Sequence, residues 1–162
     1  DLRLDFKANG EFKEMEDAIQ RHHGPVLQFI GDEIEAVFGA PITREDHPLL
    51  AVKAALEMAQ RLRQVNGELA KKGHGPLRHG IGIHTGEVLA ANIGSPNRLS
   101  YALVGDTVNL ASRLEGLNKT FGTEIIASGT TCARLNGAFS LTKLPETHIK
   151  GIGRPIDIYS VS

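Results

Sequence analysis

The sequence is poor in the features that mark secreted, membrane-spanning and strongly charged proteins. Cys132 is its only cysteine, so no disulfide can form within the chain, and a reducing compartment suits it. No apolar run approaches the ~18 residues that a membrane-spanning helix needs, and no signal peptide opens the chain. The first residue is not Met, which predicts a piece of a longer protein.

Neither sign of charge dominates. Eighteen basic and 19 acidic residues leave a net charge of -1, so no overall field favours nucleic acid or an anionic membrane. We therefore expect no nucleic-acid partner, and any phosphate site must be local.

Several nucleotide and metal motifs are absent as well. No GxxxxGK[ST] occurs, which excludes a P-loop. Residues 80–86, GIGIHTG, have the spacing GxGxxxG and no helix follows them, so they predict a strand with small residues and not a dinucleotide site. The seven histidines form no metal-type pair on a helix, and zinc is not expected.

The composition is that of one ordinary soluble domain, because 162 residues of which 41% are hydrophobic suffice to form one core. The apolar periodicity predicts helices over residues 12–22, 47–69, 106–117 and 130–135. It predicts strands over residues 26–30, 34–38, 77–84, 87–93, 101–104, 124–127, 139–144 and 156–161. Two hairpins are expected, one around Gly31-Asp32 and one around Thr85-Gly86. Helices alternating with hairpins predict an α+β fold, with helices on one face of a largely antiparallel sheet.

Two Gly-Asp pairs, Gly31-Asp32 and Gly105-Asp106, each interrupt an apolar segment, and the candidate catalytic residues lie at or after these breaks. Asp32 places a carboxylate at a hairpin tip, where it can bind Mg²⁺ together with substrate phosphates, although acidic tight turns are common without any ligand. Glu33 and Glu35 follow it along the strand and are expected to face solvent.

The helix after the second break carries Asn109 and Arg113, which are four residues apart and so share one face. Arg113 suits charge developing on a phosphoryl group, and Asn109 can orient a sugar or phosphate oxygen. Lys150 adds a cation in a Gly-flanked loop. The alternative is that all three are plain surface residues.

Charged residues of the long helix are interpreted as its solvated face, with docking of a partner as the alternative. They are Glu57, Arg61, Arg63, Glu68, Lys71 and Lys72.

Four motifs in order resemble the catalytic domain of bacterial class III adenylate and guanylate cyclases. They are QFIGD at 28–32, VFGAP at 37–41, GIGIHTG at 80–86 and VGDTVNLASRLE at 104–115. The resemblance runs from about Asn9 to the end. It implies a ferredoxin-like nucleotide cyclase fold and a head-to-tail homodimer with its active sites at the interface. It also implies two divalent metal ions, Mg²⁺ or Mn²⁺, and conversion of a nucleoside triphosphate to a 3′,5′-cyclic nucleotide and pyrophosphate.

The resemblance also implies roles for individual residues. Asp32 matches the second metal-binding aspartate, and Asn109 and Arg113 match the pair that stabilises the transition state from the other subunit. Lys150 matches the lysine that contacts the terminal phosphates. Arg98 aligns with an arginine implicated in bicarbonate sensing in some members.

The chain departs from the family pattern at three positions. The first metal aspartate usually stands in a motif like FADLRGFT before a loop, whereas this chain runs from Asp1 almost directly into its first helix. We interpret Asp1 as that aspartate with the loop missing; the alternative is an unrelated residue. Gln28 replaces the base-reading Lys of adenylate cyclases and Ala102 replaces their Asp or Thr, while the Glu and Cys of guanylate cyclases are absent too. The choice of base is therefore weakly specified.

From the sequence we expect an adenylate cyclase that makes cyclic AMP in intracellular signal transduction, with ATP favoured over GTP. The alternatives are a guanylate cyclase and a silent domain that binds nucleotide or a partner cyclase as a regulator. We expect a cytoplasmic catalytic domain, a sensor or regulatory domain elsewhere in the full chain, and leave open whether that full chain is membrane-anchored.

Overall fold

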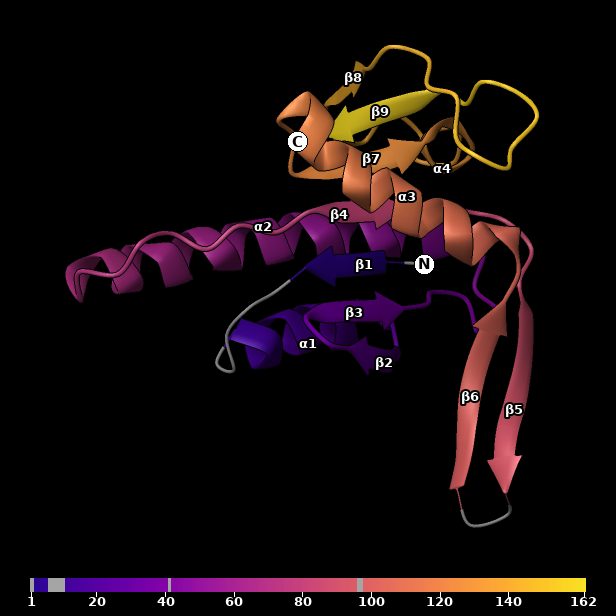
Figure 1. Cartoon of the computed structure of the whole chain (residues 1–162), viewed down its shortest axis with the longest axis horizontal. Coiled ribbons are helices and arrows are strands. Elements are labelled where there is room, and N and C mark those ends of the chain that lie inside the picture. Colours follow the sequence, from indigo (N-terminus) through magenta and orange to yellow (C-terminus); the bar gives the residue numbers. More distant parts are fainter. Residues whose placement is uncertain (1, 6–10, 41, 96–97) are drawn as a thin grey trace.

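The computed structural model describes residues 2–5, 11–40, 42–95 and 98–162 (Figure 1). The strands are β1 (Leu2–Asp5), β2 (Val26–Ile30), β3 (Glu33–Ala36), β4 (Ile81–Ile83), β5 (Leu89–Ser95), β6 (Arg98–Val104), β7 (Ile125–Ser128), β8 (Leu141–Lys143) and β9 (Ile158–Val161). The helices are α1 (Glu11–Arg21), α2 (His47–Lys71), α3 (Asp106–Phe121) and α4 (Gly129–Cys132).

Within the described residues, seven strands form one sheet in the order β2-β3-β1-β4-β7-β9-β8. The β4–β7 pair is parallel and the other pairs of this sheet are antiparallel. The expected α+β class with a mostly antiparallel sheet is therefore confirmed.

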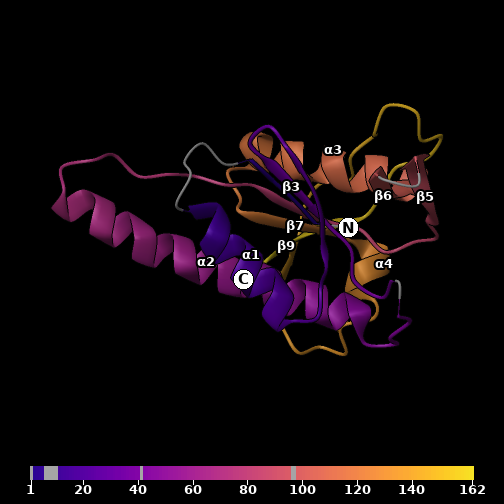
Figure 2. The same ribbon diagram turned by 90° about the horizontal axis from the view of Figure 1, so that it is seen from below.

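The helices cover both faces of this sheet, so the expectation of helices on one face is wrong. Ile125 and Ala127 of β7 belong to the core beneath α1 and α2, whereas Ile126 between them packs with Leu110 and Leu114 of α3. Figure 2 shows α3 on one side of the strands and α1 and α2 on the other. The physical reason is the continuous apolar run of β7, which buries both of its faces and so requires cover on each.

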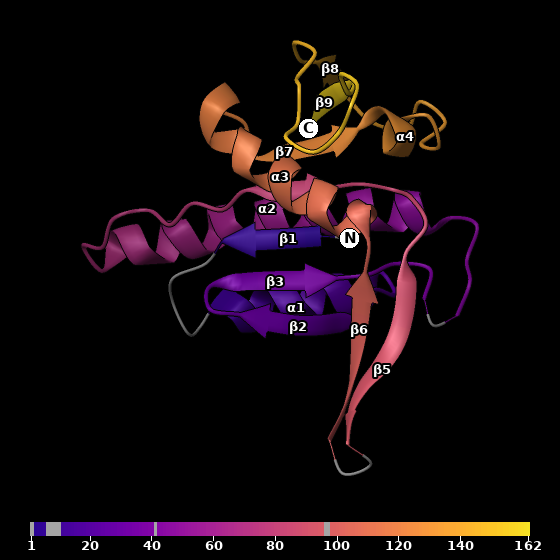
Figure 3. The ribbon, with the colours of Figure 1, turned by 45° about the vertical axis from the view of Figure 1, so that its right-hand side comes forward.

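The second predicted hairpin is also wrong, because β4 and β5 do not pair. Both edges of β4 are already occupied, one by β1 and the other by β7. The chain leaves the sheet after Ile83, and β5 pairs with β6 over the full length of both strands, from Leu89↔Val104 to Ser95↔Arg98. Figure 3 shows this hairpin projecting from the body of the domain.

The first predicted hairpin is confirmed, with Ile30 paired to Glu33 across Gly31 and Asp32. The expectation that Glu35 faces solvent is wrong, because this residue is buried. Its strand, β3, is internal to the sheet, and Glu35 stands in register between Gln28 of β2 and Arg3 of β1, so it is flanked on both sides where an edge residue is flanked on one.

The predicted solvated face of α2 is wrong for two of its residues. The side chains of Glu57 and Arg61 are only 18% and 15% exposed. Glu57 pairs with Arg21 and His22 at 2.7 and 2.6 Å, while Arg61 pairs with Glu14 and Asp17 of α1. This network of charges attaches α1 to α2. Half-buried pairs that share partners bind more firmly than isolated exposed pairs.

No helix in the described parts of the chain is long and apolar enough to span a membrane.

Candidate active site

The tip of the β2–β3 hairpin presents the carboxylate of Asp32. Gly31 adopts a φ of +60°, a conformation that glycine reaches without strain and that closes the two-residue turn. Asp32 is partly exposed, and within the described residues its carboxylate makes no hydrogen bond or ion pair. Its oxygens are thus available to a cation. Phe29 and Ile30 of the adjoining strand are 49% and 40% exposed, so apolar surface lies beside it.

Helix α3 lies against β4 because that strand has glycine where the two meet. A Cβ at Gly82 would lie 2.2 Å from the backbone oxygen of Ala111 and 2.4 Å from the nitrogen of Glu115. No larger residue fits there, since the neighbouring atoms belong to the helix backbone. The small residues of GIGIHTG therefore serve helix packing, as the strand interpretation requires. The side chain of Thr107 also donates to the carbonyl of Glu87 at 2.6 Å and ties down the first turn of α3.

This packing leaves Asn109 and Arg113 on the outer surface of α3. Leu110, Ala111 and Leu114 fill its buried face, whereas Asn109 and Arg113 are exposed. The prediction that they share one accessible face is borne out by their burial pattern.

The loop around Lys150 lies against this surface. Arg113 donates through Nη1 to the backbone carbonyl of Lys150. Ile149 before it is buried in the cluster of Leu110 and Leu114, and Ile152 after it packs on the same cluster. Lys150 itself is exposed. The structure therefore brings Asn109, Arg113 and Lys150 together on one surface, with an amide and two cations that can bind phosphate oxygens.

A cavity of about 600 Å³ lies next to these residues. Its walls include residues 151–157 of the same loop, Asp106 and Thr107 at the start of α3, and His84. Nδ1 of His84 lies 2.7 Å from the hydroxyl oxygen of Ser128, and burial lowers its pKa to about 4. The imidazole is therefore neutral at pH 7. His84 was not predicted from the sequence, and its place in GIGIHTG gave no sign of this environment.

The two candidate groups lie apart within one chain. Figure 1 shows the β2–β3 tip at the end of the sheet away from the beginning of α3, which starts where β6 joins the body. Asp32 is consequently not brought together with Asn109, Arg113 and Lys150.

The backbone register of the strands gives the positions of the remaining predicted residues. Gln28 pairs with Glu35, on the hairpin that carries Asp32. Ala102 pairs with Ala91 in the β5–β6 hairpin, in the strand that leads to α3, and Arg98 lies opposite Ser95 at the far end of that hairpin.

Asp1 lies outside the described residues. The register of β1 points to a residue that sequence reasoning missed, since Asp5 pairs with Glu33 and so lies level with the residue after Asp32. The signal that could have found it is the alternation of apolar and polar residues over 2–5, which ends on this aspartate.

No group of three His, Cys, Asp or Glu side chains suitable for a metal ion occurs in the described parts of the chain. Mg²⁺ does not require such a cluster, because it commonly binds one or two carboxylates together with substrate phosphates and water.

Comparison with known sequences matches residues 7–162 to the model of the adenylate and guanylate cyclase catalytic domain. The chain is 37% identical over 145 residues to adenylate cyclase 1 of Rhizobium meliloti (strain 1021), covering 90% of this chain and 22% of that protein. It is 34% identical over 151 residues to an adenylate cyclase of Anabaena cylindrica, covering 89% of this chain and 29% of that protein. The chain thus spans less than a third of the length of these two relatives.

Solved structures of nucleotide cyclases are similar to the chain as well. The guanylyl cyclase Cya2 superimposes with a TM-score of 0.87 at 34% identity, over 99% of this chain and 89% of that one. The adenylyl cyclase CyaB from P. aeruginosa superimposes with a TM-score of 0.88 at 26% identity, over 99% and 91% of the two chains.

Proposed function

The chain belongs to the adenylate and guanylate cyclase catalytic domain family, and from this premise we propose that it converts ATP to 3′,5′-cyclic AMP and pyrophosphate. The observation that carries the proposal is the surface on which Arg113 contacts the Lys150 loop one helical turn from Asn109. Separation of this surface from Asp32 supports a site completed by a second copy of the chain, with Asp32 of one copy facing Asn109, Arg113 and Lys150 of the other.

In this reaction the ribose 3′-oxygen attacks the α-phosphorus, and the bond from that phosphorus to the oxygen of the leaving pyrophosphate breaks. Arg113 retains donors beyond the one directed at Lys150, and these stabilise the charge that develops on the phosphate oxygens. The ammonium of Lys150 holds the terminal phosphates, and the amide of Asn109 orients a sugar or phosphate oxygen.

Asp32 fits a divalent metal site, because its carboxylate is partly exposed and unpaired among the described residues. Asp5, level with Glu33 in the sheet register, and Asp1 are the candidates for the second carboxylate. Two Mg²⁺ or Mn²⁺ ions bound there would help to ionise the 3′-hydroxyl and neutralise the phosphates.

Gln28 and Ala102 are the proposed base-contacting positions. A glutamine amide both donates and accepts, so it can pair with adenine or guanine, and Ala102 offers only backbone groups. GTP remains the second candidate substrate, because Cya2, the guanylyl cyclase, is 34% identical to this chain.

We place this catalytic domain in the cytoplasm, where nucleoside triphosphates are abundant. Its relatives are several times longer than the chain, which supports a sensor or regulatory domain elsewhere in the full protein.

The test is cyclic-nucleotide production by the purified protein with ATP and GTP in parallel and with Mg²⁺ or Mn²⁺. Asp32→Ala is the blank, and Glu68→Ala, which removes an exposed carboxylate of α2, is the matched control. Cyclic AMP that disappears only in the blank supports the proposal. Cyclic GMP as the sole product would reassign the substrate to GTP. The absence of any product from a folded dimer would favour the silent regulatory domain.

A further inference from the structure

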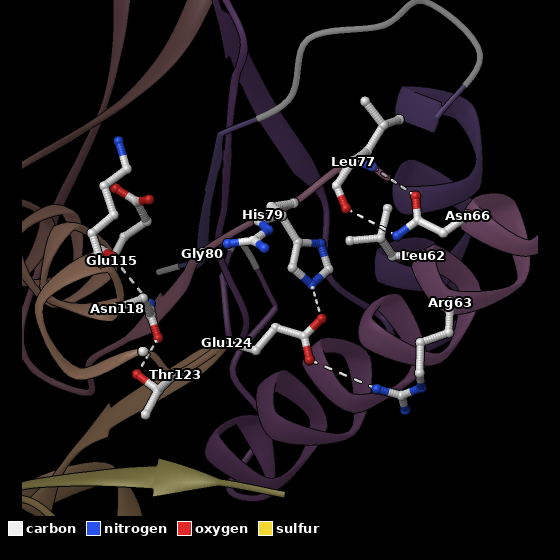
Figure 4. A pocket seen from close by; sticks show the side chains of 13 residues that line it. Leu62, Arg63, Asn66, Leu77, His79, Gly80, Glu115, Asn118, Thr123 and Glu124 are labelled. Carbon is white, nitrogen blue, oxygen red and sulfur yellow. Dashed lines mark hydrogen bonds and ion pairs between the residues drawn. The ribbon is translucent and has the colours of Figure 1, made fainter. Parts of the chain in front are cut away.

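A second cavity, of about 550 Å³, lies away from the proposed active site (Figure 4). It is enclosed by the second half of α2, the segment before β4, the end of α3 and the segment before β7. Asn109, Arg113 and Lys150 are not among its lining residues. Its volume falls within the ~300–1,000 Å³ of small-molecule sites.

Two asparagines fix the shape of this cavity. The side chain of Asn66 donates to the carbonyl of Leu77 at 2.9 Å and accepts from its amide at 2.8 Å. The side chain of Asn118 is buried, donates to the carbonyl of Ile81 at 3.0 Å and accepts from the Thr123 hydroxyl at 2.9 Å. These bonds hold α2 and α3 to the chain that enters β4, so the cavity is formed before any ligand arrives.

Of the two carboxylates in the lining, that of Glu124 is paired with His79 and Arg63. Nε2 of His79, whose side chain is fully buried, lies 3.1 Å from Oε1 of Glu124, and Arg63 lies 3.7 Å from the other oxygen. The contact with His79 holds the pKa of Glu124 below its ordinary value, so this carboxylate is ionised and paired. Glu115 is buried against the backbone of Gly80.

Arg78 differs from these groups. It lines the cavity and is exposed, and its guanidinium makes no hydrogen bond or ion pair within the parts of the chain that the structure describes. Leu62 and Leu77 supply apolar surface in the same cavity. An available guanidinium beside apolar walls suits a ligand that has an anionic end and an apolar body.

We propose that this cavity binds a small organic anion, with a carboxylate or phosphate group at Arg78 and an apolar body against Leu62 and Leu77. The ligand would contact the C-terminal end of α3, the helix whose other half carries Asn109 and Arg113. The site is distinct from the proposed catalytic surface, because the two share no lining residue among Asn109, Arg113 and Lys150.

The test is a titration of the ¹⁵N-labelled protein, followed by NMR, with 4-phenylbutyrate and 1-naphthyl phosphate as the anionic probes and 4-phenylbutyramide as the uncharged one. We expect saturable shifts at residues 62–66, 77–80 and 118–124, with at least one anion binding about tenfold more tightly than the amide. Arg78→Ala should weaken that binding about fivefold or more. Lys72→Ala, which removes an exposed cation outside the cavity, should leave it unchanged. Leu77→Trp should abolish it by filling the cavity.

The proposal is overturned if neither anion gives saturable shifts at these residues. It is equally overturned if the amide binds as tightly as the anions, or if Arg78→Ala in a folded protein leaves the affinity unchanged. All three results would be independent of cyclase activity.

Discussion

The guanidinium of Arg113 donates a hydrogen bond to the backbone carbonyl of Lys150, a residue 37 positions further along the chain. Gly151 follows with a φ of +87°, and a Cβ there would lie 3.4 Å from Nη1 of Arg113. That Cβ would make only an ordinary contact, so glycine serves the turn at this position through its positive φ. The contact fixes the Lys150 loop beside the helix face that carries Asn109.

Arg113→Ala and Asn109→Ala should each reduce kcat by about a hundredfold or more if, as proposed, both side chains contact the phosphate or sugar oxygens in the transition state. Both residues are exposed, so thermal unfolding should change little. Steady-state kinetics and circular dichroism on the same preparations check both parts. Arg44→Ala, which removes a partly exposed arginine elsewhere, should retain full activity. A loss below about threefold in both variants would remove these residues from the catalytic role.

Gly82→Ala should strongly destabilise the protein, by about 3 kcal/mol or more, because the new Cβ would collide with the backbone of α3. Gly67→Ala is the matched control, since Gly67 lies in α2 with no atom within 4 Å of the added Cβ. That variant should gain about 0.5–1 kcal/mol from improved helix propensity. Urea unfolding measures both. Equal stability of the two variants would contradict the close packing of α3 on β4.

The burial of His84 should appear in the pH dependence of stability. Its pKa is about 4 in the folded protein and 6.5 in the unfolded chain, so the unfolded state takes up a proton first as the pH falls. The stabilising contribution is complete above pH 6.5 and is lost between pH 6.5 and 4. It amounts to at most about 3 kcal/mol, and about 1–2 kcal/mol once solvent screening is allowed for.

The measurement for His84 is urea unfolding of the wild type and His84→Gln across this pH range. Glutamine does not titrate and can still bond to Ser128, so the variant should lose less stability on acidification. Parallel curves for the two proteins would show that His84 is not held neutral by the fold.

Removal of divalent metal with a chelator should abolish cyclase activity, and added Mn²⁺ or Mg²⁺ should restore it. Asp32→Asn should raise the metal concentration needed for half-maximal activity, because it removes one anionic oxygen ligand. Activity measured against free metal concentration tests both statements. Full activity in excess chelator would exclude the proposed metal site at Asp32.

Local patterns predicted part of this structure well. The four-residue spacing of Asn109 and Arg113 and the two-residue break at Gly31-Asp32 depend only on neighbours in the chain, and both features are present. Sheet order depends on contacts between distant segments. The pairing of β4 with β1 and β7 could not be derived from residues 77–93 alone, and this is why a false hairpin was predicted there.

The burial of polar side chains was the other feature that the sequence predicted wrongly. Glu35, Glu57 and Arg61 have the composition of a solvated surface, and the partners that half-bury Glu57 and Arg61 lie in other elements. The cavity beside Arg78 likewise arises from four segments that no local pattern connects.

The most direct test of the shared active site is complementation between two inactive variants, Asp32→Ala and Arg113→Ala. In a mixed dimer, one site loses both residues and the other retains both. Unfolding and refolding an equal mixture should therefore restore about a quarter of wild-type cyclase activity, since half of the dimers are mixed and each has one intact site. Each variant refolded alone should stay inactive. A refolded mixture no more active than the separate variants, although shown to contain mixed dimers, would contradict a site built from two copies of the chain.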